Sequence, residues 1–273
     1  MSIREITIHR IASTHVDREA VQRWLSVIGA DEFEIPAPEA VSDPALLIAL
    51  AGKRCYQSWQ PALNPNVTKI RKDYVEYFDN ILASKHGSCL EHSVFTYAFE
   101  GVTRVFTAEM NRHRAGWAIS EGSLRFIRFG DDVPYWLPLS LCDAPDDDAD
   151  LRKRKEDSRS LFEEAFAADQ RIYSALVKIW DLDAKDKNFS YKKRVTSCLR
   201  RIIGLGVCTG GVWTGNVRAL RHVFAMRAST AAEEEICHVF SQIVADMAVR
   251  EPLLFGDFYK TADGFWAPKY EKV

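Results

Sequence analysis

The chain has 273 residues, and its 47% hydrophobic and 27% charged content is that of an ordinary globular protein. Its formal net charge of −2 excludes a uniformly basic surface for nucleic acid, so any anion site must be a local cluster of basic side chains. No apolar run reaches the roughly 20 residues that a membrane span needs, and no signal-peptide core is found. We therefore expect a cytoplasmic protein with no nucleic-acid or membrane partner.

The cysteine spacing favours neither a disulfide framework nor a zinc site. No two of the six cysteines form a C-x-x-C pair, and the close Cys/His neighbours are Cys89 with His92 and Cys237 with His238. A structural zinc ion needs four such ligands, and no second matching pair is present. We expect no metal and reduced, mostly buried thiols.

Hydrophobic periodicity predicts one strand and three helices in the first third of the chain. Residues 3–11 are expected to form the strand and residues 17–29 the first helix. A second helix would span residues 44–56 with Asp43 as its cap, and a third would span residues 67–84.

The middle of the chain alternates between strand and helix patterns. Residues 92–101 alternate as a strand, residues 103–113 read as a helix, and residues 121–129 read as a further strand. The acidic stretch 143–150 is expected to be a solvated loop and helix entry, because its carboxylates lack the spacing of a metal site.

The remainder is helical with a glycine-rich interruption. Helices are predicted over residues 151–182, 191–205, 216–227 and 231–249. No internal repeat or domain-sized linker is found, so we expect a mixed α/β (α+β) fold in which residues 1–273 form a single domain.

The helix expected over residues 216–227 carries arginine on an apolar face. Arg227 shares that face with Leu220 and Val223, whereas Arg218 and His222 lie opposite at i, i+4. A buried guanidinium needs an anionic partner, because leaving it unpaired costs roughly several kcal/mol. A ligand and a structural ion pair to a neighbouring helix remain alternatives for Arg227. The two polar faces suggest two ligands, or a ligand and a subunit interface.

A basic triplet, Arg112-His113-Arg114, ends the helix expected over residues 103–113. Arginine presents a rigid fork of donors that suits phosphate, and it stays charged. Glu109 precedes His113 by four residues, which is the spacing of an ion pair on a helix surface. Taken alone, the triplet is compatible with a solvated basic turn or with an anion site.

Together these motifs resemble the flavin-dependent thymidylate synthases. Residues 86–96 (HGSCLEHSVFT) are similar to the family's histidine–EH–FT segment, and residues 112–125 (RHRAGWAISEGSLR) are similar to its RHR motif with a trailing serine and arginine. The segment 213–236 matches the family's third segment in order and spacing, and residues 55–58 are similar to an early family segment. The resemblance spans roughly residues 50–130 and 195–258.

The resemblance implies a homotetramer with active sites shared between subunits and a fold with an antiparallel-containing sheet and long helices. FAD would be the cofactor, NADPH its reductant and 5,10-methylenetetrahydrofolate the carbon donor to C5 of a uracil nucleotide. No enzyme cysteine would attack the base, since the flavin carries the redox step and the protein supplies orientation and charge.

The resemblance also implies residue roles. The residues that would hold FAD are His86, Ser88, Glu91, Arg112, His113, Arg114, Asn216, Arg218 and His222. The residues that would contact the nucleotide are Glu109, Glu121, Ser123, Arg125, Arg200 and Arg227. Ser123, Arg125 and Arg200 would take the phosphate, and a strand over residues 121–129 would point Ser123 and Arg125 to the same side. Arg227 and Ser123 would be the catalytic residues, with Arg227 gripping the uracil edge and stabilising its developing charge.

The chain departs from the family pattern at several positions. The segment 115–120 makes the motif one residue longer, Glu109 stands where the family usually has Gln, and Phe126 where it has Tyr. A Leu-Pro pair is replaced by Ile203-Gly204. A carboxylate repels a phosphate, so Glu109 is expected to face a hydroxyl or a ring N–H. A longer loop would enlarge the pocket.

Two functional hypotheses follow. The first is reductive C5-methylation of a uracil nucleoside monophosphate, with dUMP and UMP as alternative substrates, because some family members in nucleoside-antibiotic pathways take UMP. The segment 115–120 is expected to govern that choice. The second is a degenerate relative that binds flavin or nucleotide without turnover, which the departures suggest and the retained arginines oppose. A general basic interaction module is disfavoured, since the arginines are spaced for one pocket.

Overall fold

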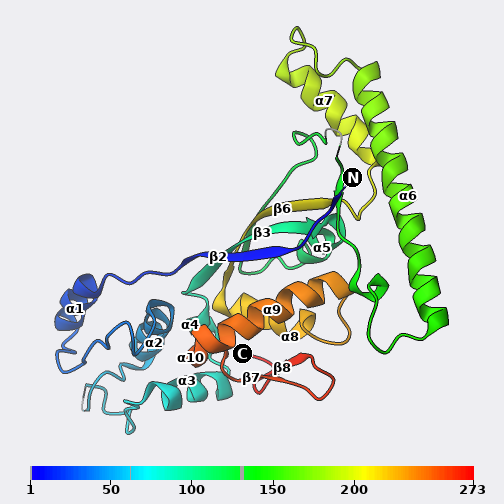
Figure 1. Cartoon of the computed structure of the whole chain (residues 1–273). Helices are drawn as coiled ribbons and strands as arrows, with labels where there is room; N and C mark the ends of the chain where they lie inside the picture. The colour runs from blue at the N-terminus through cyan, green and yellow to red at the C-terminus, as the bar shows by residue number, and fades with distance from the viewer. Residues whose placement is uncertain (1, 62, 130–131) are drawn as a thin grey trace. The chain divides into compact units, whose positions relative to one another are not determined.

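The computed structural model describes residues 2–61, 63–129 and 132–273, which form two compact units (Figure 1). The first unit comprises Met1–His9, Ala98–Arg112 and Ile119–Val212. The second comprises Arg10–Tyr97, His113–Ala118 and Trp213–Val273. That residues 1–273 form a single domain stays a prediction. Within the described ranges, no helix has the length and apolar composition needed to cross a membrane.

A four-stranded sheet carries the segments that lead into the predicted motifs. Its strand order is β2 (Thr7–Ser13), β3 (Val94–Thr103), β6 (Cys208–Asn216) and β4 (Trp117–Glu121). Along β3 the aromatic side chains at alternate positions are buried, which is the period-2 pattern expected for this strand.

The second unit is mainly helical. Its first helices are α1 (Arg18–Val27), α2 (Asp43–Tyr56), α3 (Tyr74–Ala83) and the short α4 (Gly87–Leu90). Its last elements are α8 (Val217–Arg227), α9 (Glu234–Arg250), α10 (Pro252–Phe255) and the antiparallel pair β7 (Phe258–Lys260) and β8 (Trp266–Pro268).

The core of this unit fixes the orientation of α8. Phe224 of α8 packs against Phe240 of α9 at 6.1 Å between ring centroids, and against Phe255 of α10 at 5.4 Å. All three rings are fully buried, and burial of each contributes about 1.5–3 kcal/mol. Because this apolar face is anchored, the polar positions of α8 are held in fixed directions.

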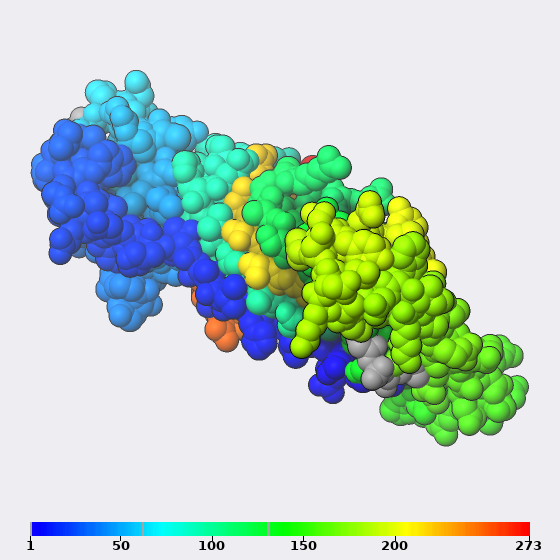
Figure 2. All heavy atoms as spheres, turned by 90° about the horizontal axis from the view of Figure 1, so that it is seen from above, coloured from blue at the N-terminus to red at the C-terminus, as the bar shows by residue number. Residues whose placement is uncertain are grey.

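The first unit contains two long helices that pack together. Its elements are α5 (Arg104–Met110), α6 (Ala149–Ile179), α7 (Phe189–Leu199), the 3₁₀ turns η1 (Leu139–Leu141) and η2 (Arg200–Ile202), and the parallel pair β1 (Ser2–Ile3) and β5 (Pro134–Tyr135). The buried residues Tyr173, Leu182, Val195 and Leu199 form a core between α6 and α7. In the space-filling view α7 and the C-terminal part of α6 form one continuous surface (Figure 2).

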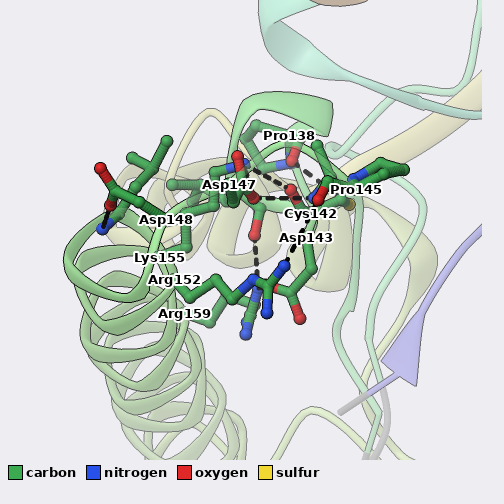
Figure 3. A network of polar contacts seen from close by, with 12 residues as sticks. Pro138, Cys142, Asp143, Pro145, Asp147, Asp148, Arg152, Lys155 and Arg159 are labelled. Atoms are coloured by element: carbon green, nitrogen blue, oxygen red, sulfur yellow. Dashed lines mark hydrogen bonds and ion pairs between the residues drawn. The ribbon is translucent and has the colours of Figure 1, made fainter.

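The acidic stretch before α6 is a loop and helix entry, as its sequence predicts. Asp148 caps α6 by accepting from Leu151 N at 2.7 Å, and Lys155 pairs with Asp147 at 2.6 Å (Figure 3). The other residues of the stretch are exposed, as expected, and only the Asp147 side chain, at 7% exposed, is covered. The loop is therefore fastened to the helix by ion pairs.

Several sequence predictions are wrong in detail. Residues 67–73 are not helical, because Asp73 accepts from Glu76 N and begins α3 at Tyr74. Ser42, not Asp43, caps α2. The helix expected over residues 103–113 ends at Met110, so Glu109 and His113 lack the helical i, i+4 relation.

Two further errors concern strands. The strand expected over residues 121–129 is a turn, and the neighbouring strand β4 precedes it at Trp117–Glu121. Strand β6 was not predicted at all. The segment 115–120 is therefore not a loop throughout, since its last four residues belong to β4.

Candidate functional site

The N-terminus of α8 is the centre of a polar cluster in the second unit. Asn216 caps the helix, and its Oδ1 accepts from Ala219 N at 2.8 Å. Its own backbone N–H donates to the carbonyl of Gly116 at 3.0 Å. Gly116 has φ +75°, and a Cβ there would lie 2.7 Å from Asn216 Nδ2. Only glycine lets the segment after the basic triplet approach the helix this closely.

Arg218 is the cluster's main cation. Its NH1 lies 2.6 Å from Glu91 Oε1, and its Nε donates to the main-chain oxygen of Val273 at 3.0 Å. Both partners of the ion pair are about half exposed, at 47% and 49%. Sequence reasoning assigned Arg218 and Glu91 to one cofactor site, and the structure brings them into direct contact.

The histidine of the basic triplet contacts the C-terminal end of α8. Arg227 Nε donates to His113 Nε2 at 2.9 Å, so this ring nitrogen acts as an acceptor. The His113 ring also packs edge-on against His222, with centroids 6.2 Å apart. Three residues predicted for cofactor and substrate therefore form one contiguous group.

A cavity of about 520 Å³ opens beside this cluster, a size within the range of roughly 300–1,000 Å³ typical of ligand sites. Its wall includes Lys85, Glu91, Ala115, Gly116, Asn216, Arg218, His222 and residues 270–273. Four of the cofactor-binding candidates, Glu91, Asn216, Arg218 and His222, thus face one space.

The remaining cofactor candidates do not line the cavity at α8. His86 precedes α4, stacks on Tyr56 at 5.6 Å between centroids and contacts its hydroxyl at 3.2 Å. These two side chains line a second cavity of about 210 Å³. Ser88 on α4 is exposed, as are Arg112 and Arg114, which flank His113.

In the first unit, a turn brings two nucleotide candidates together. The carbonyl of Ser123 accepts from Phe126 N and Ile127 N, both at 2.9 Å, which turns the chain back on itself. The Ser123 hydroxyl accepts from Arg125 Nε at 3.4 Å. The two side chains are neighbours because of this turn, and not because of the strand alternation that the sequence suggested.

An ion pair fixes the start of the turn. Arg104 NH1 lies 3.0 Å from Glu121 Oε1, and Arg104 NH2 donates to the carbonyl of Gly122. Among the described residues, Glu121 Oε2 and Arg104 Nε are buried without a hydrogen-bond partner. Glu121 was predicted to contact substrate, and the structure pairs it with an arginine that sequence reasoning did not select. Glu109 lies on α5 and Arg200 is exposed at the start of η2.

Phe126 lies beside two cations. Its ring stacks on Phe189 at 5.9 Å with an interplanar angle of 8°. Arg125 Cζ lies 5.3 Å and Lys193 Nζ 5.1 Å from the Phe126 centroid. Sequence reasoning missed Lys193, although it precedes Arg200 by seven residues, which is about two helical turns.

The buried arginine of α8 is Arg221, and not Arg227 as the apolar stripe predicted. Arg221 is 4% exposed and pairs with both carboxylate oxygens of Asp257, at 2.6 and 2.8 Å. It also donates to the carbonyl of Leu254 at 2.6 Å. The structural ion pair held open for this helix therefore exists, but at a different residue. Arg227 is only partly buried.

Comparison with known proteins gives consistent matches over most of the chain. A family model described as thymidylate synthase complementing protein matches residues 38–253. The flavin-dependent thymidylate synthase of Mycobacteroides abscessus is 31% identical over 245 residues, covering 88% of this chain and 91% of that protein. The enzyme of the same name from Mycobacterium tuberculosis is 31% identical over 230 residues, covering 83% and 84%.

Solved structures agree with the fold. The UMP/dUMP methylase PolB from Streptomyces cacaoi, bound with 5-Br dUMP, aligns with a TM-score of 0.62 at 16% identity, covering 94% of this chain and 96% of that one. Thymidylate synthase X from Helicobacter pylori, with FAD and dUMP, aligns with a TM-score of 0.53 at 18% identity, covering 78% and 93%. The expected mixed α/β fold is confirmed, whereas the tetramer stays a prediction.

Proposed function

The chain belongs to the flavin-dependent thymidylate synthase family, and on that basis we propose that it catalyses reductive C5-methylation of a uracil nucleoside 5′-monophosphate. Family membership makes it an FAD-dependent methyltransferase, so the expected enzyme class and FAD cofactor are confirmed. In the proposed reaction methylenetetrahydrofolate donates the carbon and NADPH the reducing equivalents. The contiguous group of His113, His222 and Arg227 beside the cavity at α8 is the observation that supports it best.

The residues at α8 fit a phosphorylated, negatively charged cofactor. Glycines at positions 87 and 116 let the backbone pack closely against the site, since a Cβ there would lie 2.7 Å from Arg218 Nε and Asn216 Nδ2 respectively. Asn216, Arg218 and His222 bring amide, guanidinium and imidazole donors to this space. These residues, with His86, Glu91 and the basic triplet, are the ones we propose to hold FAD.

When bound and reduced, the flavin supplies the hydride that turns the transferred one-carbon unit into a methyl group. The nucleotide loses its C5 hydrogen as a proton in exchange for the new carbon bond. The task of the protein is to hold the uracil ring in place and to stabilise negative charge on it. Arg227 brings a guanidinium to the site, and its bond to His113 fixes the direction of that group.

We propose that the nucleotide phosphate binds at the turn of the first unit. Ser123 offers a hydroxyl and Arg125 a guanidinium, and the two are already in contact. Glu121 offers a carboxylate oxygen that could accept from a sugar hydroxyl. Glu109 and Arg200 complete the proposed substrate set.

Both dUMP and UMP are proposed substrates. The solved relative PolB is named a UMP/dUMP methylase, and this chain shares its fold. The segment 115–120 is retained as the proposed determinant of the choice, through residues 115 and 116 that line the cavity.

The proposal is tested with the purified protein. We expect it to carry FAD, and we expect dUMP or UMP to stimulate its oxidation of NADPH. A protein that binds FAD but whose NADPH oxidation ignores both nucleotides would instead be a relative without turnover.

A further inference from the structure

We propose that Lys193, which lies outside the motifs described above, is a further ligand of the nucleotide phosphate, and that the ring of Phe126 holds it beside Arg125. This inference rests on the proposed function, since it takes Ser123 and Arg125 as the start of a phosphate site. All the residues involved belong to the first unit.

The geometry places two cations around one ring. Lys193 Nζ and Arg125 Cζ lie 5.1 and 5.3 Å from the same Phe126 centroid. Both distances are within the roughly 6 Å at which a cation is attracted to an aromatic face. Phe189, four residues before Lys193 on the same helix, stacks parallel to Phe126 and docks α7 against the turn. The helix thereby brings Lys193 to the side chain that follows Arg125.

The two positive charges of Arg125 and Lys193 favour an anionic ligand between them. No carboxylate lies within 4.0 Å of Arg125 or Lys193 in the described part of the chain, whereas Arg128, Lys155 and Arg159 of this unit are paired with aspartates. Because both charges lie close to the same ring centroid, solvent ions screen their mutual repulsion only in part, since the Debye length is about 8–10 Å. The ring faces offset only part of that repulsion. A phosphate dianion would turn the repulsion into attraction to both side chains.

The phenylalanine itself has a role in this arrangement. The family usually has a tyrosine at the position of Phe126, and the phenylalanine ring here presents no hydroxyl to compete with the phosphate for Lys193 or Arg125. Its 47% exposure leaves the ring edge open to solvent while both cations stay close. A lysine on a flexible stem can then reach the phosphate as a point charge.

The structure offers a matched control on the same helix region. Lys187 Nζ also lies over an aromatic ring, 5.7 Å from the Tyr191 centroid, but it pairs with Asp186 at 3.4 Å. Lys187→Gln therefore removes the same charge and the same type of ring contact without touching the proposed phosphate site.

The test is calorimetric titration of the full-length, flavin-loaded protein with dUMP and UMP, and with the uncharged nucleosides deoxyuridine and uridine. We expect Lys193→Gln to weaken nucleotide binding about tenfold, the effect of losing one hydrogen bond to a charged group. Nucleoside binding should not change, and Lys193→Arg should restore most of the nucleotide affinity. Lys187→Gln should bind nucleotides like the wild type.

Each contrary outcome is decisive. Equal nucleotide affinity in Lys193→Gln and wild type, or equal weakening of nucleotide and nucleoside, would overturn the assignment of Lys193 while leaving the proposed function intact. Wild-type protein that binds neither dUMP nor UMP would overturn the proposed function and this inference together. Should Lys193→Gln fail to fold, Phe126→Leu keeps both charges but removes their shared ring, and it is expected to weaken nucleotide binding in the same direction.

Discussion

Replacing Gly116 by alanine tests whether the segment after the basic triplet is held against α8 by close contact. Gly116 has φ +75°, a conformation that costs an L-residue about 1–2 kcal/mol. The added Cβ would also lie 2.7 Å from Asn216 Nδ2 and 2.8 Å from Ala219 Cβ. Overpacking of this kind costs about 1–3 kcal/mol. We therefore expect Gly116→Ala to lower the free energy of unfolding by about 2–5 kcal/mol.

Replacing Gly264 by alanine separates the cost of the backbone conformation from the cost of overpacking. It has φ +83°, and nothing lies within 4 Å of the Cβ that alanine would add. Gly264→Ala should therefore cost only the backbone part, about 1–2 kcal/mol. Urea unfolding of the flavin-free variants gives both values, and FAD titration should show weaker binding in Gly116→Ala alone, because its Cβ displaces Asn216. Equal unfolding free energies and equal FAD affinities in the two variants would refute this account of the cluster.

Three further predictions concern single charges. Arg221→Ala should destabilise the protein by about 3–5 kcal/mol because it leaves Asp257 buried and unpaired. Arg227→Ala should abolish turnover with a much smaller shift in Tm. If Arg227→Ala lowered the Tm more than Arg221→Ala, these roles would be contradicted. Arg104→Ala should raise the KM for nucleotide more than it lowers kcat, because the turn at Ser123 loses its anchor, and an unchanged KM would make Arg104 purely structural. Burial lowers the pKa of Lys53 to about 8, below its usual 10.5. Between pH 8 and 10.5 the folded state therefore binds fewer protons than the unfolded state, so the stability of wild type relative to Lys53→Met should rise with pH across that window. A stability difference in urea unfolding that does not change with pH would be inconsistent with a buried, destabilised ammonium.

The sequence predicted most helices well, because their ends are set by local caps. Asp17 and Asn216 accept from backbone N–H groups at the starts of α1 and α8. Strand β6 was missed because its glycines weaken the strand pattern. In the fold one of them is required by a close approach, since a Cβ on Gly210 would lie 2.6 Å from the carbonyl oxygen of Phe99.

The sequence predicted which residues belong to the site better than it predicted how they contact one another. The motifs selected His113 and Arg227, but their contact joins residues 114 positions apart and depends on how the chain returns to α8. Local spacing also assigned the buried arginine to the wrong position, because the apolar stripe of α8 is wider than one row of residues and includes Arg221. Lys193 lies outside the motifs on which the resemblance rests, and the packing of Phe189 on Phe126 reveals it.

Release of tritium from C5 of labelled uracil nucleotides tests the central claim most directly. The protein, supplied with FAD, NADPH and methylenetetrahydrofolate, is incubated separately with C5-tritiated dUMP and UMP, and the tritium released to water is counted. Because methylation replaces the C5 hydrogen, we expect release from at least one nucleotide, dependent on both cosubstrates and absent in Arg227→Ala. No release from either nucleotide by flavin-loaded protein would contradict the proposed methylation.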